Sequence, residues 1–234
     1  NRTGPGSGRT AGTPLLEMRN VHFSYERHVP VFSGLSFEMY GGEVVAVLGT
    51  NGSGKTTLAK LACGLLRPAS GSVRVAGRHP HRIPARELPG ILGYVFQNPE
   101  HQFVRDRVRD EVAFTLERRP LEETERDRHV EETLHRLSLD GLEQRNPFSL
   151  SHGQKRRLSA ATMLVAGAPL IAFDEPTFGQ DWGHLMELEQ MLEELSAQGV
   201  ALLIITHDVE LARRHADRIL FVPSGEVSSV GEGA

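Results

Sequence analysis

Short apolar runs alternate along most of the chain with segments that have the periodicity of amphipathic helices. The most apolar runs, Val44–Leu48, Leu170–Phe173 and Ala201–Ile205, have the length of buried strands. Because strands and helices take turns, we expect an α/β fold with a mainly parallel sheet. The other predicted strands are Leu16–Phe23, Leu35–Met39, Ser72–Ala76, Ile91–Phe96 and Ile219–Val222. Helices are predicted over Lys55–Leu66, Leu158–Val165, Leu185–Leu195 and Val209–Arg214.

A charged stretch of about residues 98–168 has a different pattern. Its amphipathic segments Val108–Arg118 and Leu121–Leu137 predict a helical subdomain inserted into the α/β chain. Residues 1–14 are rich in Gly, Pro, Thr, Ser and Arg and lack apolar periodicity, which predicts a flexible linker or a remnant of cloning. We expect residues 15–234 to form one domain.

Composition narrows the classes of function. The 234 residues, 39% of them hydrophobic, suffice for one substantial core. A formal net charge of -4 gives no support for nucleic-acid binding, which needs a basic surface. Cys63 is the single cysteine and lies in an apolar helical pattern, so we expect core packing there. No apolar run approaches the roughly 20 residues that span a bilayer, so a membrane role is expected to need a partner.

A glycine-rich loop follows the strand Val44–Leu48 and precedes a predicted helix. It reads GTNGSGKT and matches the pattern G-x-x-x-x-G-K-[ST] in the required context. Backbone N–H groups of such a loop, with the positive end of the helix, hold phosphate oxygens. Lys55 is expected to reach the β- and γ-phosphates, and the Thr56 hydroxyl to ligate Mg²⁺. The predicted ATP-binding residues of this loop are Gly49, Asn51, Gly52, Ser53, Gly54, Lys55, Thr56 and Thr57.

The strand Leu170–Phe173 ends in two acids and resembles a Walker B strand. That resemblance implies that Asp174 binds magnesium and that Glu175, as catalytic base, polarises the attacking water. A strand end with two exposed acids is the alternative interpretation of these residues alone.

The pentapeptide LSHGQ, residues Leu150–Gln154, resembles the signature LSGGQ of ABC ATPases. Locally it is also a capping box, with Ser151 as the N-cap and Gln154 three residues later, before the helix Leu158–Val165. The capping box explains the Ser and the Gln. It does not explain why the motif precedes a Walker B strand in a chain with a phosphate-binding loop.

The order of these motifs is similar to that of ABC ATPases over nearly the whole chain, from Leu15 to Val230. The resemblance implies a P-loop NTPase core, an N-terminal antiparallel β subdomain and an inserted helical subdomain. It also implies a head-to-tail dimer that encloses two nucleotides. The residues that would act on the partner's ATP are Ser151, His152, Gly153 and Gln154.

Four further residues match the family in order. Gln97 matches the Q-loop glutamine near magnesium, and His207 the switch histidine that contacts the γ-phosphate. Asp181 matches the D-loop acid, and Tyr25 the aromatic residue that stacks on adenine. A lone His, Gln or Tyr is more often structural, so these roles rest on the joint order. With Lys55 and Glu175, the resemblance implies catalysis by Gln97 and His207.

Finer resemblance indicates the energy-coupling-factor (ECF) importers for vitamins, their precursors or transition metals. It lies in four segments: Val95–Gln102, Asp110–Phe114, Gly153–Ser159 and Asp174–Asp181. Such ATPases imply a second ATPase subunit, an integral membrane scaffold and a substrate-binding membrane subunit, at the cytoplasmic face of the membrane. Some such ATPases are fused in tandem, and the linker-like start and missing Met suit the second half of such a fusion.

One departure from the family bears on mechanism. His152 replaces the first glycine of the signature, and its imidazole either crowds the γ-phosphate or contributes a hydrogen bond.

The rival functions are a soluble ABC ATPase acting on DNA or ribosomes, and a P-loop GTPase or kinase. The acidic charge disfavours the first. The absence of an N-K-x-D motif disfavours a GTPase, and neither a GTPase nor a kinase explains the segment Leu150–Gln154.

Overall fold

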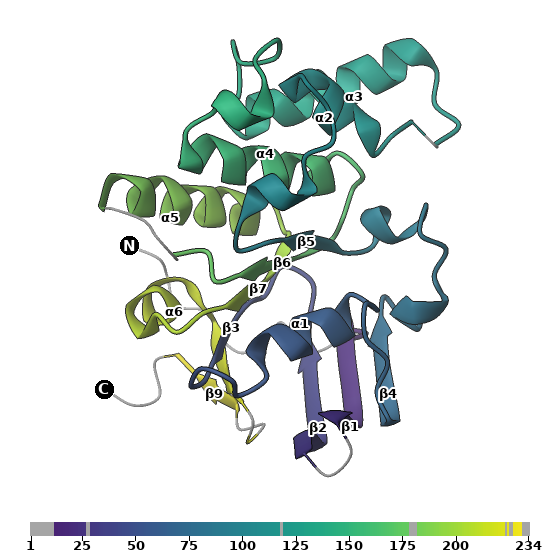
Figure 1. The fold of residues 1–234 in the computed structure, drawn as a ribbon, viewed down its shortest axis with the longest axis vertical. Coiled ribbons are helices and arrows are strands. Elements are labelled where there is room, and N and C mark those ends of the chain that lie inside the picture. The colour runs from purple at the N-terminus through teal and green to yellow at the C-terminus, as the bar shows by residue number, and fades with distance from the viewer. Residues whose placement is uncertain are drawn as a thin grey trace.

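The computed structural model describes residues 12–26, 29–117, 119–177, 182–222, 224 and 227–230. Over these residues the chain forms two sheets with helices around them (Figure 1). The predicted N-terminal linker falls almost entirely outside the described residues, as does Asp181. Among the described residues, no helix is long and apolar enough to cross a membrane.

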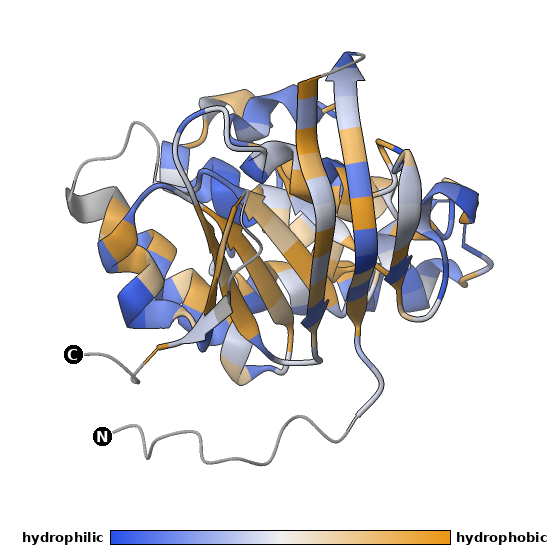
Figure 2. Cartoon of the chain, turned by 90° about the horizontal axis from the view of Figure 1, so that it is seen from below, coloured by the Kyte–Doolittle hydropathy of each residue, from blue (hydrophilic) through white to orange (hydrophobic). Residues whose placement is uncertain are grey.

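The first sheet is antiparallel and has the order β2-β1-β4. It comprises β1 (Leu16–Glu26), β2 (Val29–Met39) and β4 (Ser70–Val75). Buried and exposed side chains largely alternate along these strands, since one face of the sheet packs on the core. Figure 2 shows the alternation as bands along the two long strands. Both β1 and β2 are longer than predicted. The end of β1 and the start of β2 are exposed, so these residues lack the apolar pattern from which the strands were predicted.

The second sheet has the order β5-β6-β7-β3-β8-β9 and is parallel except for β9. Its strands are β3 (Val44–Leu48), β5 (Gly93–Val95), β6 (Leu170–Asp174), β7 (Ala201–Ile205), β8 (Arg218–Phe221) and β9 (Val227–Ser229). β3, β6 and β7 are buried at every position, as the continuous apolar runs predicted. The predicted α/β fold is confirmed; β9 was missed.

The central sheet separates two apolar clusters. Val44, Ala46 and Leu48 of β3 join the cluster that contains the helices α4 and α5, whereas Val45 and Val47 join the one that contains α1 and the antiparallel sheet. This alternation is the two-residue period of a strand whose two faces are both covered. Figure 2 shows the strands of the central sheet as predominantly apolar.

Helices pack on both faces of the central sheet. They are α1 (Lys55–Ala62), α2 (Val108–Phe114), α3 (Glu123–Arg136), α4 (His152–Leu164), α5 (Trp182–Ala197) and α6 (Val209–His215). Four short 3₁₀ turns are η1 (Pro80–Arg82), η2 (Leu88–Gly90), η3 (Pro99–Gln102) and η4 (Pro147–Ser149). The helices α2, α3 and α4 of the predicted insertion contact one another at one end of the molecule (Figure 1).

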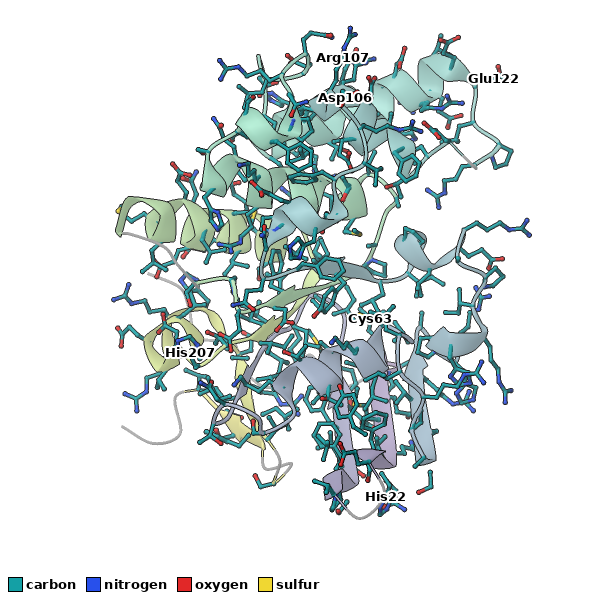
Figure 3. The ribbon with its side chains drawn as sticks, viewed as in Figure 1. His22, Cys63, Asp106, Arg107, Glu122 and His207 are labelled. Atoms are coloured by element: carbon teal, nitrogen blue, oxygen red, sulfur yellow. The ribbon has the colours of Figure 1, made fainter. Side chains whose placement is uncertain are left out.

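The end of α1 differs from the prediction. The apolar pattern predicted a helix to Leu66, but α1 ends at Ala62. Gly64 has a φ of 71°, and a Cβ there would lie 2.7 Å from the backbone N of His81. The chain therefore turns against η1, and Leu65 is 60% exposed instead of buried on the helix face. Cys63 is buried next to this turn, in the interior of the molecule, as expected (Figure 3).

Candidate functional site

The glycine-rich loop joins the end of β3 to the start of α1, as predicted. Gly52 and Gly54 have φ values of 80° and 101°, in the left-handed region that glycine adopts without strain. At Gly49 an added Cβ would lie 2.5 Å from the carbonyl oxygen of Val222, which follows β8. The loop is therefore closely packed at its start and left-handed at its end, where α1 begins with Lys55.

Replacing Gly54 with Ala is expected to lower the free energy of unfolding by about 1–3 kcal/mol, because the new Cβ would lie 2.6 Å from Cγ1 of Val31. Gly52→Ala is the matched control: its φ is also positive, but nothing lies within 4 Å of an added Cβ. Urea unfolding of both variants measures the difference. Equal losses would mean that backbone strain, and not crowding, sets the cost at Gly54.

Lys55 is buried and turns back on its own loop. Its Nζ donates to the carbonyl oxygens of Gly49 at 2.9 Å and Thr50 at 3.3 Å. The same ammonium lies 3.6 Å from Oε1 of Glu175. The Lys55 ammonium is thus held beside the loop by two carbonyl oxygens and by the Glu175 carboxylate. From this position it can form a hydrogen bond to an anion bound at the loop.

Asp174 is the last residue of β6, and both of its oxygens are occupied. The Thr56 hydroxyl donates to Oδ1 at 3.1 Å, and the Tyr94 hydroxyl donates to Oδ2 at 2.5 Å. Burial, and then the hydrogen bond to Asp174, raise the pKa of Tyr94, so this phenol stays protonated and donates. Tyr94 was predicted only as part of a buried strand; a tyrosine among apolar neighbours is a weak signal for a site.

Glu175 follows with a φ of 47°, which costs a residue other than glycine about 1–2 kcal/mol. Its N–H donates to the carbonyl oxygen of Ile205 at 2.8 Å, so the neighbouring strand β7 holds the turn. Its Oε2 lies 2.7 Å from Nδ1 of His207 and 3.3 Å from the backbone N of the same residue. The strained backbone therefore places this carboxylate between the Lys55 ammonium and the His207 imidazole, which lies near α6 (Figure 3).

Residues of the glycine-rich loop, together with Glu175 and His207, line a cavity of about 630 Å³. Tyr25, which is 60% exposed, stands at its rim, with its ring edge-to-face on Phe23 and its hydroxyl 3.1 Å from Oγ1 of Thr57. Val31 also lines the cavity and was not predicted. The predicted site residues that line it are Tyr25, Asn51, Gly52, Gly54, Lys55, Thr56, Thr57, Gln97, Glu175 and His207. An electropositive loop, a cation and an exposed aromatic ring suit a phosphorylated nucleotide.

The residues of the LSHGQ motif lie elsewhere. Ser151 caps α4: its hydroxyl accepts from the Gln154 N–H at 3.2 Å, and the Gln154 side chain accepts from the Ser151 N–H at 3.0 Å. The predicted capping box is confirmed. His152 lines a second cavity of about 470 Å³, which shares Thr56 and Gln97 with the first and also includes Asp174. The motif does not line the 630 Å³ cavity of its own chain.

The segment after Gln97 is attached to α4. Glu100 in η3 pairs with Lys155 at 2.6 Å, and this hydrogen bond lowers the pKa of the Glu100 carboxyl. The Gln102 side chain donates to the carbonyl oxygen of Ser159 at 3.4 Å and to the Thr162 hydroxyl at 3.2 Å. The segment that follows Gln97 is therefore joined by side-chain contacts to the helix that begins at the LSHGQ motif.

Comparison with known proteins identifies the family. The sequence model of the ABC transporter family matches residues 32–178, more than half of the chain. The chain belongs to the ABC transporter family. The chain is the ATP-binding cassette of an ABC transporter, the part that binds and hydrolyses ATP.

Relatives and solved structures agree with this. An ABC transporter ATP-binding protein of Pyrococcus furiosus, provisionally so named, is 39% identical over 93% of this chain and 84% of its own length. YkoD of Bacillus subtilis, provisionally named as an HMP/thiamine import ATP-binding protein, is 38% identical over 90% of this chain, which spans 38% of YkoD. The structure of cbiO1 from Clostridium perfringens, part of the ABC transporter complex cbiONQ, matches with a TM-score of 0.83 and 29% identity, over 92% of this chain and 87% of that one. The ABC ATPase fold predicted from the motifs is confirmed.

Proposed function

We propose that this cassette energises an ECF-type importer by closing head-to-tail around MgATP with a second ATPase subunit. The main support for a pair of cassettes is that the glycine-rich loop and the LSHGQ motif lie apart in the chain's own structure. The phosphate-binding loop lines the 630 Å³ cavity, whereas Ser151–Gln154 lie outside it at the start of α4. Ser151, Gly153 and Gln154 line neither cavity of their own chain, so in this proposal the nucleotide that they contact is that of a partner. The likeness to cbiO1 and YkoD supports the ECF assignment.

In this proposal the cavity holds the triphosphate and the Tyr25 ring stacks on the adenine. Lys55 exchanges its bonds to Gly49 and Thr50 for phosphate oxygens, at little cost because its cationic group is already in place. Glu175 accepts a hydrogen bond from the attacking water and orients it. His207, now 2.7 Å from the same carboxylate, donates to the γ-phosphate as charge develops there.

The residues around Asp174 fit a magnesium ion. The Thr56 hydroxyl oxygen and Oδ1 of Asp174 are 3.1 Å apart, and Gln97, whose amide oxygen is a further possible ligand, lines the second cavity together with them. Hard oxygen ligands of this kind, with several retained waters, are what Mg²⁺ prefers. When bound, the ion neutralises charge on the β- and γ-phosphates. Thr56 would hold it directly, and Asp174 through water.

The region of about residues 98–168 would form the helical subdomain that faces the membrane scaffold at the cytoplasmic side. The Glu100–Lys155 pair then connects Gln97, next to the ATP, with α4 and its signature. With the scaffold and a substrate-binding membrane subunit, closure of the two cassettes would drive uptake of a vitamin, a vitamin precursor or a transition metal.

The paired arrangement is tested by light scattering on Glu175→Gln, which should trap the closed state. We expect the mass to rise from 25.8 kDa to about twice that value on addition of MgATP. ATP without the metal is the control and should leave a monomer. A monomer that still binds MgATP would contradict self-pairing and indicate an obligate different partner.

The importer assignment is tested by isolating the tagged chain from solubilised membranes of its source cells. Two integral membrane proteins in fixed stoichiometry with it are the expected result. Recovery with ribosomes or DNA, and no membrane protein, would instead support the soluble ABC ATPase.

A further inference from the structure

A buried tyrosine holds one oxygen of the acid at the end of β6. Tyr94 lies on β5, where it pairs in register with Ala172 of the parallel neighbour β6. It is 8% exposed, with its ring edge-to-face on Phe96 at 4.8 Å. From there its hydroxyl reaches Asp174, two residues beyond its register partner, at 2.5 Å.

Because of this contact, the two oxygens of Asp174 accept hydrogen bonds from different donors. Oδ2 accepts from the phenol, and Oδ1 accepts from the Thr56 hydroxyl at the entrance of α1. A carboxylate with one oxygen fixed cannot rotate freely, because rotation would leave a buried phenol without an acceptor at a cost of about 1–3 kcal/mol. Oδ1 is thereby kept toward Thr56 and the phosphate-binding loop.

We propose that Tyr94 is a positioning residue for the magnesium site, acting through Asp174. The inference rests on the proposed function, because it presupposes that Thr56 and Asp174 hold the ion. The phenol fixes the carboxylate plane before the metal arrives, so that no ordering of Asp174 accompanies binding. With Oδ2 held by the phenol, Oδ1 is the carboxylate oxygen that would remain available to the ion.

A purely structural tyrosine would behave differently. It would contribute a buried hydrogen bond, and its loss would lower stability without changing metal affinity. Tyr40 offers a comparison: its half-buried hydroxyl donates to Oε2 of Glu38 at 3.0 Å, outside both cavities. Tyr40→Phe removes the same type of bond from a carboxylate that holds no metal.

The test uses Mn²⁺ as a paramagnetic substitute for Mg²⁺, in the Glu175→Gln background so that ATP is not consumed. Equilibrium dialysis against a fixed concentration of ATP, with the Mn²⁺ of both chambers counted by electron paramagnetic resonance, gives the Mn²⁺ that the protein holds beyond the Mn²⁺ bound to free ATP. Tyr94→Phe is expected to weaken Mn²⁺ binding about 10- to 100-fold, the usual effect of losing a group that orients a metal ligand. ATP affinity in EDTA should equal that of the parent, and Tyr40→Phe should leave both values unchanged.

Affinities are normalised to the fraction of protein that binds ATP in EDTA, so partial unfolding cannot imitate the result. A Tyr94→Phe protein with lower thermal stability but parental Mn²⁺ affinity would overturn the inference and leave the magnesium site intact. Failure of the parent itself to take up Mn²⁺ with ATP would instead contradict the proposed magnesium site. In the Asp174→Asn background, Tyr94→Phe should have no further effect; an undiminished effect would show that Tyr94 does not act through Asp174.

Discussion

Glu175→Gln is expected to retain ATP binding and to hydrolyse ATP roughly 10²- to 10⁴-fold more slowly, the range for loss of a general base. The amide keeps the size of the side chain but removes the anionic acceptor that orients water. The structure gives this carboxylate little freedom, because its turn is held by Ile205 and its side chain lies between Lys55 and His207. ATP binding should survive, since the carbonyl oxygens of Gly49 and Thr50 still hold the Lys55 ammonium at the loop when Glu175 is changed.

Phosphate release measured at saturating ATP, together with equilibrium binding of a fluorescent ATP analogue, separates the two effects. The control is Glu210→Gln on α6, an equally conservative change at an exposed carboxylate that pairs with Arg214. It should hydrolyse ATP like the parent. Hydrolysis at the parental rate in Glu175→Gln would refute the assignment of the base and leave the fold and the ATP site untouched.

Lys55→Ala is expected to weaken ATP binding about 10- to 100-fold. Hydrogen bonds to charged groups contribute about 1.5–3 kcal/mol each, and about 1.4 kcal/mol corresponds to a factor of ten in affinity. Lys55 is buried at the loop with its ammonium already directed by two carbonyl oxygens, so a nucleotide meets a fixed charge. Loss of Lys55 also removes the cation that lies 3.6 Å from Glu175, so the Glu175 carboxylate would then repel the triphosphate.

Isothermal titration calorimetry with ATP, in the presence and absence of Mg²⁺, measures the change. Arg67→Ala is the control, since it removes one positive charge from an exposed side chain shortly after the same helix and lies outside both cavities. Equal losses in the two variants would mean that overall charge attracts ATP, and would contradict a specific role of Lys55. Lys55→Arg keeps the positive charge but replaces the compact ammonium with a guanidinium. Weaker ATP binding by this variant would likewise indicate a specific role of Lys55.

Much of the core could be predicted from the sequence, because a fully buried strand needs apolar side chains at consecutive positions. That requirement marked β3, β6 and β7 within one residue of their ends. The phosphate-binding loop was equally evident, since the left-handed φ at Gly52 and Gly54 restricts which residues can stand there. Weakly apolar β9 and the exposed ends of β1 and β2 lacked such a requirement.

The sequence by itself therefore determined the α/β class, the place of the glycine-rich loop and, through the order of motifs, the ABC family. Only the tertiary structure decided which side chains meet. Tyr94 reaches Asp174 because β5 and β6 pair in one particular register, and Glu175 meets His207 because β6 lies beside β7. The early end of α1 likewise depends on η1 packing against Gly64. Patterns along a chain report the local burial of each segment, whereas contacts between segments depend on sheet order and register, which no single segment encodes.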